Sequence, residues 1–151
     1  MSAPSRNDAP GLNRRDELAA SGAVMSEAPW ALAAAAGAVT AGGDLVLHAM
    51  FWHFAITSPL SLGAVAFFAV AGAGSLLRSR GSRAMTWARR NPWRFAVLPG
   101  AACAIVVFVL AVVLGGSGMV GGAFTALWHG AAAYGLTGLA GSAGRTRRRT
   151  A

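Results

Sequence analysis

Four long apolar stretches, separated by short polar breaks, dominate the chain. They cover residues 30–56, 59–77, 95–114 and 118–141. Each matches or exceeds the roughly 20 residues that a helix needs to cross the hydrocarbon core of a bilayer. None shows the alternation of a membrane β-strand, and a helix satisfies its own backbone hydrogen bonds, as lipid requires. The pattern predicts an all-α protein, a four-helix transmembrane bundle made of two hairpins.

The polar segments divide the chain around this membrane domain of residues 28–141. Residues 1–27 mix Pro, Asn and Gly with charges and predict a disordered cytoplasmic tail, although the stretch from Arg14 to Glu17 could open a short helix. Residues 78–94 form a basic loop between the second and third spans, and residues 142–151 form a short basic tail. The tail that precedes the first span lacks the features of a secretory signal peptide.

The composition agrees with a membrane protein. Of the 151 residues, 55% are hydrophobic and 12% are charged. The charged share is about half of the roughly 25% that is usual for a soluble domain. The net charge of +8 therefore has to be interpreted by position along the chain, because in a membrane protein arginines first of all set orientation.

The arginines predict how the chain is threaded through the membrane. Three lie before the first span, six in the loop 78–94 and four after the last span, whereas the connections at 57–58 and 115–117 have none. With four crossings, all of them face the same side, which the positive-inside rule makes the cytoplasm. Trp30, Trp87 and Trp93 would lie near the inner interface and Trp52 near the outer one. We therefore expect a multi-pass protein of the plasma (inner) membrane with both termini in the cytoplasm.

The basic loop is the first candidate site. It combines arginines with aromatic residues in a segment that could form a short amphipathic helix. Such residues can contact anionic lipid headgroups, or phosphates and bases of a nucleic acid. Lipid contact explains the same residues without a further partner, and we prefer it. The residues concerned are Arg78, Arg80, Arg83, Trp87, Arg89, Arg90, Trp93 and Arg94.

Small residues at intervals of four predict helix packing. The fourth span carries Gly118, Gly122, Ala126 and Gly130, and the first span repeats the spacing with Ala33, Gly37 and Ala41. In lipid, helices associate mainly through small residues that let their backbones approach closely. We expect the ridge of the fourth span to form a helix contact, either within one chain or between copies in a homo-oligomer.

The second candidate site is polar and lies inside the predicted spans. Asp44 and His48 are four residues apart, so they share one helix face. By helix rise, Asp44 and His129 each lie about 16 Å from one end of their spans, so they could meet across the bundle. Three interpretations remain open, namely a proton relay or polar cavity, a hydrogen-bonded clamp between helices, and a carboxylate at the outer interface.

No motif for catalysis or for a cofactor accompanies these residues. The chain has no HExxH or CxxC spacing, no nucleophile elbow and no phosphate-binding motif. Cys103 lies within an apolar run, where a thiol is ordinarily inert packing. We expect no catalytic residues, no metal and no cofactor, and therefore a protein that is not an enzyme.

The preferred function is thus structural, or that of an interaction subunit that can form oligomers. In layout and composition, the apolar hairpins, the basic loop and the Arg-rich tail resemble small spread proteins of conjugative elements in high-GC bacteria. That resemblance implies an alternative function, a membrane component of a DNA-transfer system that contacts DNA or an acidic partner through its basic loop. A further alternative is a proton-linked small transporter, or a holin-like pore, that uses Asp44.

Overall fold

The computed structural model describes residues 13–51, 56–77 and 82–147, with side chains placed as far as residue 143. All of the regular structure in these ranges is helical, which confirms the all-α part of the predicted fold class. The helices are α1 (Arg14–Ser26), α2 (Trp30–Met50), α3 (Thr57–Leu77), α4 (Arg83–Arg90), α5 (Pro92–Val113) and α6 (Gly118–Arg147).

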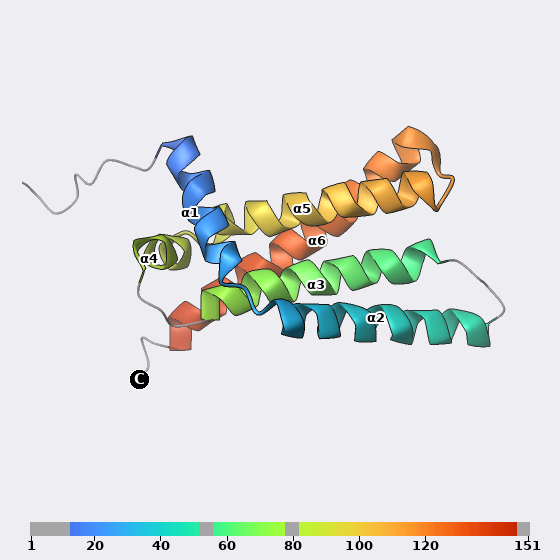
Figure 1. Cartoon of the computed structure of the whole chain (residues 1–151), viewed down its shortest axis with the longest axis horizontal. Helices are drawn as coiled ribbons and strands as arrows, with labels where there is room; N and C mark the ends of the chain where they lie inside the picture. The colour runs from blue at the N-terminus through green and yellow to red at the C-terminus, as the bar shows by residue number, and fades with distance from the viewer. Residues whose placement is uncertain (1–12, 52–55, 78–81, 148–151) are drawn as a thin grey trace, which may run out of the picture.

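The four long helices lie lengthwise beside one another, and the two short helices lie together at one end of them (Figure 1). We call α1 and α4 the cap. The opposite end, which we call the far end, holds the C-termini of α2 and α5 and the N-termini of α3 and α6. The described chain begins and ends on the side of the cap (Figure 1).

Three of the long helices, α2, α3 and α5, are long and apolar enough to cross a membrane, where the sequence predicts four spans. The helix that falls short is α6, the fourth predicted span. It is the longest helix, but Gly residues, Thr125, Thr137 and His129 make it less apolar than the other three. Length and composition of the described residues are therefore compatible with a membrane location and support three candidate spans, not four.

Several predicted boundaries also change. Residues 14–26 of the predicted disordered tail form α1, whereas residues 1–12 lie outside the described residues. The first span ends at Met50, and Trp52, expected at the outer interface, lies in the undescribed stretch 52–55. The loop 78–94 contains the short helix that was considered for it, α4, and α5 already begins at Pro92. The last helix continues to Arg147, beyond the predicted end at residue 141.

The cap is built on an apolar cluster that the tail, the loop and the long helices share. Val24 and Met25 of α1 and Met85 and Ala88 of α4 are buried together with Phe95 of α5. Ser82 is the N-cap of α4, and its hydroxyl accepts a hydrogen bond from the Met85 amide at 3.1 Å. Burial of this apolar face explains why α1 is ordered even though its first turn is polar.

The remaining packing brings α5 against α6 and α2 against α3, and α3 also contacts α5 and α6. A second buried cluster, formed by Val65, Cys103, Val107 and Ala133, lies between α3, α5 and α6. The hairpin of α5 and α6 and the hairpin of α2 and α3 thus both exist, as predicted. They are joined mainly through α3, which leaves α2 at the edge of the bundle (Figure 1).

Candidate functional sites

A polar cleft of about 230 Å³ opens at the far end of the bundle. It lies between the start of α3, the end of α5 and the start of α6. Its wall is completed by Ala111 and Gly115 at the end of α5. Its polar side chains are Thr57, Ser58, Ser61, Ser117, Thr125 and His129.

Asp44 lies on the other side of α3 from this cleft and is connected to it by Ser58. The Ser58 hydroxyl donates a hydrogen bond to Asp44 Oδ2 at 3.3 Å. The same carboxylate oxygen lies 3.3 Å from His48 Nδ1, which also contacts the Asp44 carbonyl oxygen at 2.9 Å. The Asp44 side chain is 18% exposed and the His48 side chain 31%. Asp44 and His48, which the sequence places on one helix face, are thus in contact within α2, and the hydrogen bond from Ser58 ties α2 to the first turn of α3.

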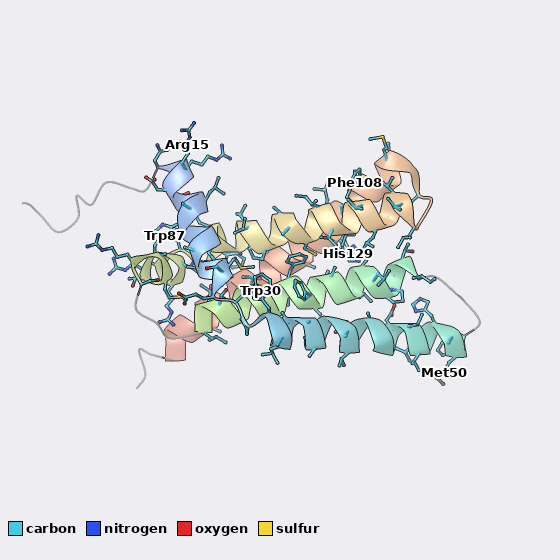
Figure 2. The ribbon with its side chains drawn as sticks, in the orientation of Figure 1. Arg15, Trp30, Met50, Trp87, Phe108 and His129 are labelled. Atoms are coloured by element: carbon cyan, nitrogen blue, oxygen red, sulfur yellow. The ribbon has the colours of Figure 1, made fainter. Side chains whose placement is uncertain are left out.

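His129 lies in the cleft on α6, between α3 and α5 (Figure 2). Its Nδ1 lies 2.8 Å from the Thr125 carbonyl oxygen, which can only accept, so Nδ1 carries a hydrogen. The hydrogen-bond and ion-pair partners of Asp44 in the described chain are His48 and Ser58, not His129. The expected meeting of Asp44 and His129 across the bundle is thus not observed, because helix rise gives equal depths but not the position of α3 between α2 and α6.

This arrangement differs from that of a nucleophilic triad. In such a triad the serine hydroxyl bonds to the imidazole, and the carboxylate orients the other ring nitrogen. Here Ser58 and His48 both approach the same oxygen of Asp44, so the imidazole does not receive the serine proton. The geometry is that of a hydrogen-bonded clamp between two helices, one of the three interpretations left open by the sequence.

The floor beneath the cleft is apolar. Cys103, Val107 and Ala133 are fully buried toward the middle of the bundle, and the Cys103 thiol lies 3.8 Å from the His129 carbonyl oxygen. Nearer the cap, Thr137 is fully buried and its hydroxyl has no hydrogen-bond partner among the described residues. These described residues between the cleft and the cap are therefore buried, and all of them except Thr137 are apolar.

The basic site divides into arginines that hold the cap and arginines on its surface. Arg89 Nε donates to the Leu76 carbonyl oxygen at 3.0 Å, at the C-terminal end of α3. Arg94 forms an ion pair with Glu17 and so ties α5 to α1. The side chains of Arg83 and Arg90 are exposed, whereas Arg78 and Arg80 lie outside the described residues.

The two tryptophans of the basic site are also largely used within the fold. Trp87 packs against the apolar cluster of the cap. Trp93 lies against Tyr134, with ring centroids 5.5 Å apart, and against Gly138 of α6. Trp87 is half-buried by this packing, whereas Trp93 remains 42% exposed.

The small residues predicted for helix packing do pack, with one exception. A Cβ on Gly122 would lie 2.8 Å from Val112 Cγ2, and one on Gly130 would lie 2.7 Å from Ala104 Cβ, while Ala126 is 5% exposed. The ridge therefore packs on α5 within one chain. Gly118 does not take part, because it begins the helix with a φ of +65° and nothing lies near it.

Sequence reasoning missed the side chains that complete these sites. Ser58 lies in the break before the second span, Ser117 directly precedes the last span, and Thr125 lies about two turns into it. Hydroxyl groups near span ends carry a weak signal, because they usually bond to their own helix. The pair of Glu17 with Arg94 joins residues 77 positions apart and has no local signal at all.

Comparisons with known proteins give no further information about these sites. No family model matches the chain, and no curated protein or solved structure is significantly similar to it.

Proposed function

We propose that this protein is a four-pass interaction subunit of the inner membrane, which rests on the cytoplasmic leaflet through its cap and offers α2 to a second copy of itself. The observation that carries the proposal is the uneven burial of its spans. Only 11% of the apolar window of α2 is buried, against 44% for α3 and 33% for α5. A helix with so little contact inside its own chain is available to a neighbour.

The threading rests on the direction of α6. It runs antiparallel to α5, which it contacts from Gly122 to Gly141, and returns to the side of the cap (Figure 1). Gly and Thr lower its hydropathy, but helices packed among other helices in membranes are commonly rich in small residues. Four crossings also leave every arginine of the chain on the cap side, in agreement with the positive-inside rule.

The cap suits the surface of an anionic leaflet. Arg83 and Arg90 are exposed on α4, and Arg14 and Arg15 are exposed on α1. Each arginine near an anionic membrane surface contributes about 1 kcal/mol of attraction. Both chain ends would then lie in the cytoplasm.

An apolar groove of about 400 Å³ lies beside α2 and is the contact surface that we propose. Ala34, Gly37 and Ala38 of α2 form one side of it, and Phe67 and Phe68 of α3 form the other. Ala34 and Ala38 are exposed, so the backbone of another helix can approach closely at this point. In a twofold contact each copy would present the same small residues to its partner.

Single cysteines test the proposed contact. Cys103→Ala removes the native thiol, which is fully buried, and Ala38→Cys then adds one in the groove. Oxidation in isolated membranes should give a dimer of Ala38→Cys. The matched control is Leu127→Cys, since Leu127 is 70% exposed on α6, away from the groove.

Equal cross-linking of the two variants would mean that the dimers form by random collision in the membrane, which would contradict the proposal. A product of another mass from Ala38→Cys alone would replace the second copy by a different protein. The threading has its own test, because reporter fusions at residues 85 and 151 should both report the cytoplasm. A periplasmic signal at either one would overturn the four-pass arrangement.

A further inference from the structure

The far-end cleft is lined mainly by hydrogen-bond acceptors. The reason is that most of the hydroxyl and imidazole hydrogens of its lining side chains already bond to oxygens of the protein. The Ser117 hydroxyl donates to the Ala111 carbonyl oxygen at 2.9 Å, and the Thr125 hydroxyl donates to that of Gly121 at 3.0 Å. A carbonyl can only accept, so both hydroxyl hydrogens point away from any ligand. The two oxygens can offer only lone pairs to the cleft.

The other polar groups of the cleft follow the same rule. The Ser58 hydroxyl gives its hydrogen to the Asp44 carboxylate, and His129 Nδ1 gives its hydrogen to the Thr125 carbonyl oxygen. In the neutral imidazole, His129 Nε2 is then an acceptor. Four side chains around the cleft therefore present lone pairs. They are Ser58, Ser117, Thr125 and His129.

Ser61 adds a further hydroxyl to the cleft. It is one of the lining residues, although only 3% of the residue is exposed. A hydroxyl group can rotate, so it can present either its oxygen or its hydrogen to a ligand.

A carboxylate lies close to the cleft. Asp44 accepts a hydrogen bond from Ser58 of the lining and is also in contact with His48 of its own helix. No arginine is among the lining residues. Of the three helices that border the cleft, α3 and α6 begin there and α5 ends there, so the dipole of α5 opposes those of the other two. Acceptors beside a carboxylate favour a ligand that donates hydrogen bonds and carries a positive charge.

We propose that the far-end cleft binds a small organic cation with N–H donors, a primary alkylammonium ion. Its ammonium group donates to the hydroxyl oxygens and to His129 Nε2, and the Asp44 carboxylate balances its charge through Ser58. The volume of about 230 Å³ corresponds to roughly seven water molecules, so a short alkyl chain fits beside Ala111 and Gly115. This site is independent of the proposed contact along α2.

Calorimetry on the purified full-length chain in detergent tests the site, at about pH 8, where primary alkylamines remain cations. The probe is propylammonium chloride, and tetramethylammonium chloride and sodium chloride are the comparison salts. Propylammonium should bind measurably better than either salt, because only it donates N–H hydrogen bonds. Tetramethylammonium carries the same charge but has no N–H group, so it tests whether hydrogen bonding is needed. Sodium tests whether the site prefers an organic cation to a metal ion.

Two variants locate the site. Asp44→Asn keeps an oxygen that can accept from Ser58 but removes the charge, and it should weaken propylammonium binding about tenfold or more. Thr125→Val removes one acceptor at nearly constant shape and should weaken binding about fivefold. The control is Thr40→Val, since Thr40 also donates to the carbonyl four residues before it but is exposed on α2 outside the cleft.

Several outcomes would overturn the proposal. They are equal binding of tetramethylammonium or sodium, binding of chloride alone, and affinities that do not differ between Asp44→Asn and the wild-type chain. The comparison of salts uses the wild-type chain only, so the test keeps its meaning if a variant fails to fold.

Discussion

The two hairpins of this bundle use the same kind of contact to very different extents. The pair α5 and α6 has close approaches along its whole length, from Gly122 at the far end, through Gly130, to Gly138 beside Trp93 near the cap. The pair α2 and α3 has close approaches in two places. A Cβ on Gly37 would lie 2.9 Å from the Gly63 carbonyl oxygen, and one on Gly74 would meet Pro29, the N-cap of α2. The ring pair Trp30–Phe67 and the Asp44–Ser58 hydrogen bond complete that contact.

This difference divides the bundle into a part whose helices are held firmly together, which we call the fixed part, and a part that is available for contact with another molecule. Apolar helices gain little from burial against one another in lipid, so the number of close approaches determines how firmly they are held. The pair α5 and α6, with α3 against it, forms the fixed part. Helix α2 is held at fewer points, and only 11% of its apolar window is buried.

The largest effect on stability is expected from Gly130→Leu, which places a large side chain in the middle of the contact between α5 and α6. A Cβ at this position would lie 2.7 Å from Ala104 Cβ and 2.9 Å from the Gly100 carbonyl oxygen. Because these are neighbours with little freedom to move, the two helices must separate. Such overpacking should lower the free energy of unfolding by about 3 kcal/mol, as measured by unfolding with dodecyl sulfate in mixed micelles.

The control for Gly130→Leu is Gly135→Leu, since a Cβ on Gly135 of the same helix would meet nothing within 4 Å. Equal destabilisation by the two changes would mean that side-chain size on α6, and not contact with α5, sets the stability. The distinction between the two hairpins would then have no basis.

A smaller effect is expected from Gly37→Leu, which separates α2 from α3. The new side chain would meet the Gly63 carbonyl oxygen and Phe67 Cβ, which lies 3.1 Å from the built Cβ position. We expect a loss of about 1 to 2 kcal/mol, because α2 can move away without disturbing α5 and α6. Cross-linking of Ala38→Cys should fall as well, whereas the Trp93–Tyr134 contact should persist. A loss as large as that of Gly130→Leu would contradict the view of α2 as an edge helix.

The sequence predicts most of the long helices and much of their packing, because apolar length and the spacing of small residues are local signals. The Gly122, Ala126 and Gly130 ridge and the Gly37 contact could be predicted this way. Gly118 shows the limit of the approach, since its positive φ depends on the turn before the helix. The interval of four residues alone does not show where the helix begins.

The cap and the cleft were harder to predict, because they depend on contacts between segments far apart in sequence. The helix α1 is stabilised by the cluster around Phe95 and by the Glu17–Arg94 pair, neither of which a local pattern reveals. In the cleft, Asp44 and His129 could be selected as polar residues in apolar segments. Ser58, which connects Asp44 to the cleft, could be found only from the arrangement of α2 beside α3.

A modest effect is expected from Ser58→Ala, which removes the polar tie between α2 and α3. Hydrogen bonds between membrane helices contribute about 0.6 kcal/mol on average, and Asp44 keeps His48 as a partner. The expected loss of stability is therefore about 0.5 to 1 kcal/mol in the same unfolding assay. Ser142→Ala is the control, because its hydroxyl bonds only within α6, to the Gly138 carbonyl oxygen. A loss above that of Gly37→Leu would make the Asp44 cluster, and not the glycine contact, the main link of this hairpin.

The smallest effect, and the only one of opposite sign, is expected from Gly42→Ala in the half of α2 nearer the far end. Nothing lies within 4 Å of a Cβ at this position, and an alanine in a helix interior is favoured over glycine by about 0.5 to 1 kcal/mol in water. A gain of a few tenths of a kcal/mol is therefore expected in dilute micelles, where each chain is alone. Destabilisation under those conditions would mean that α2 is more tightly packed within its own chain than its exposure indicates. Destabilisation that grows with protein concentration would instead show that a second copy packs against Gly42, which extends the proposed contact along α2 toward the far end.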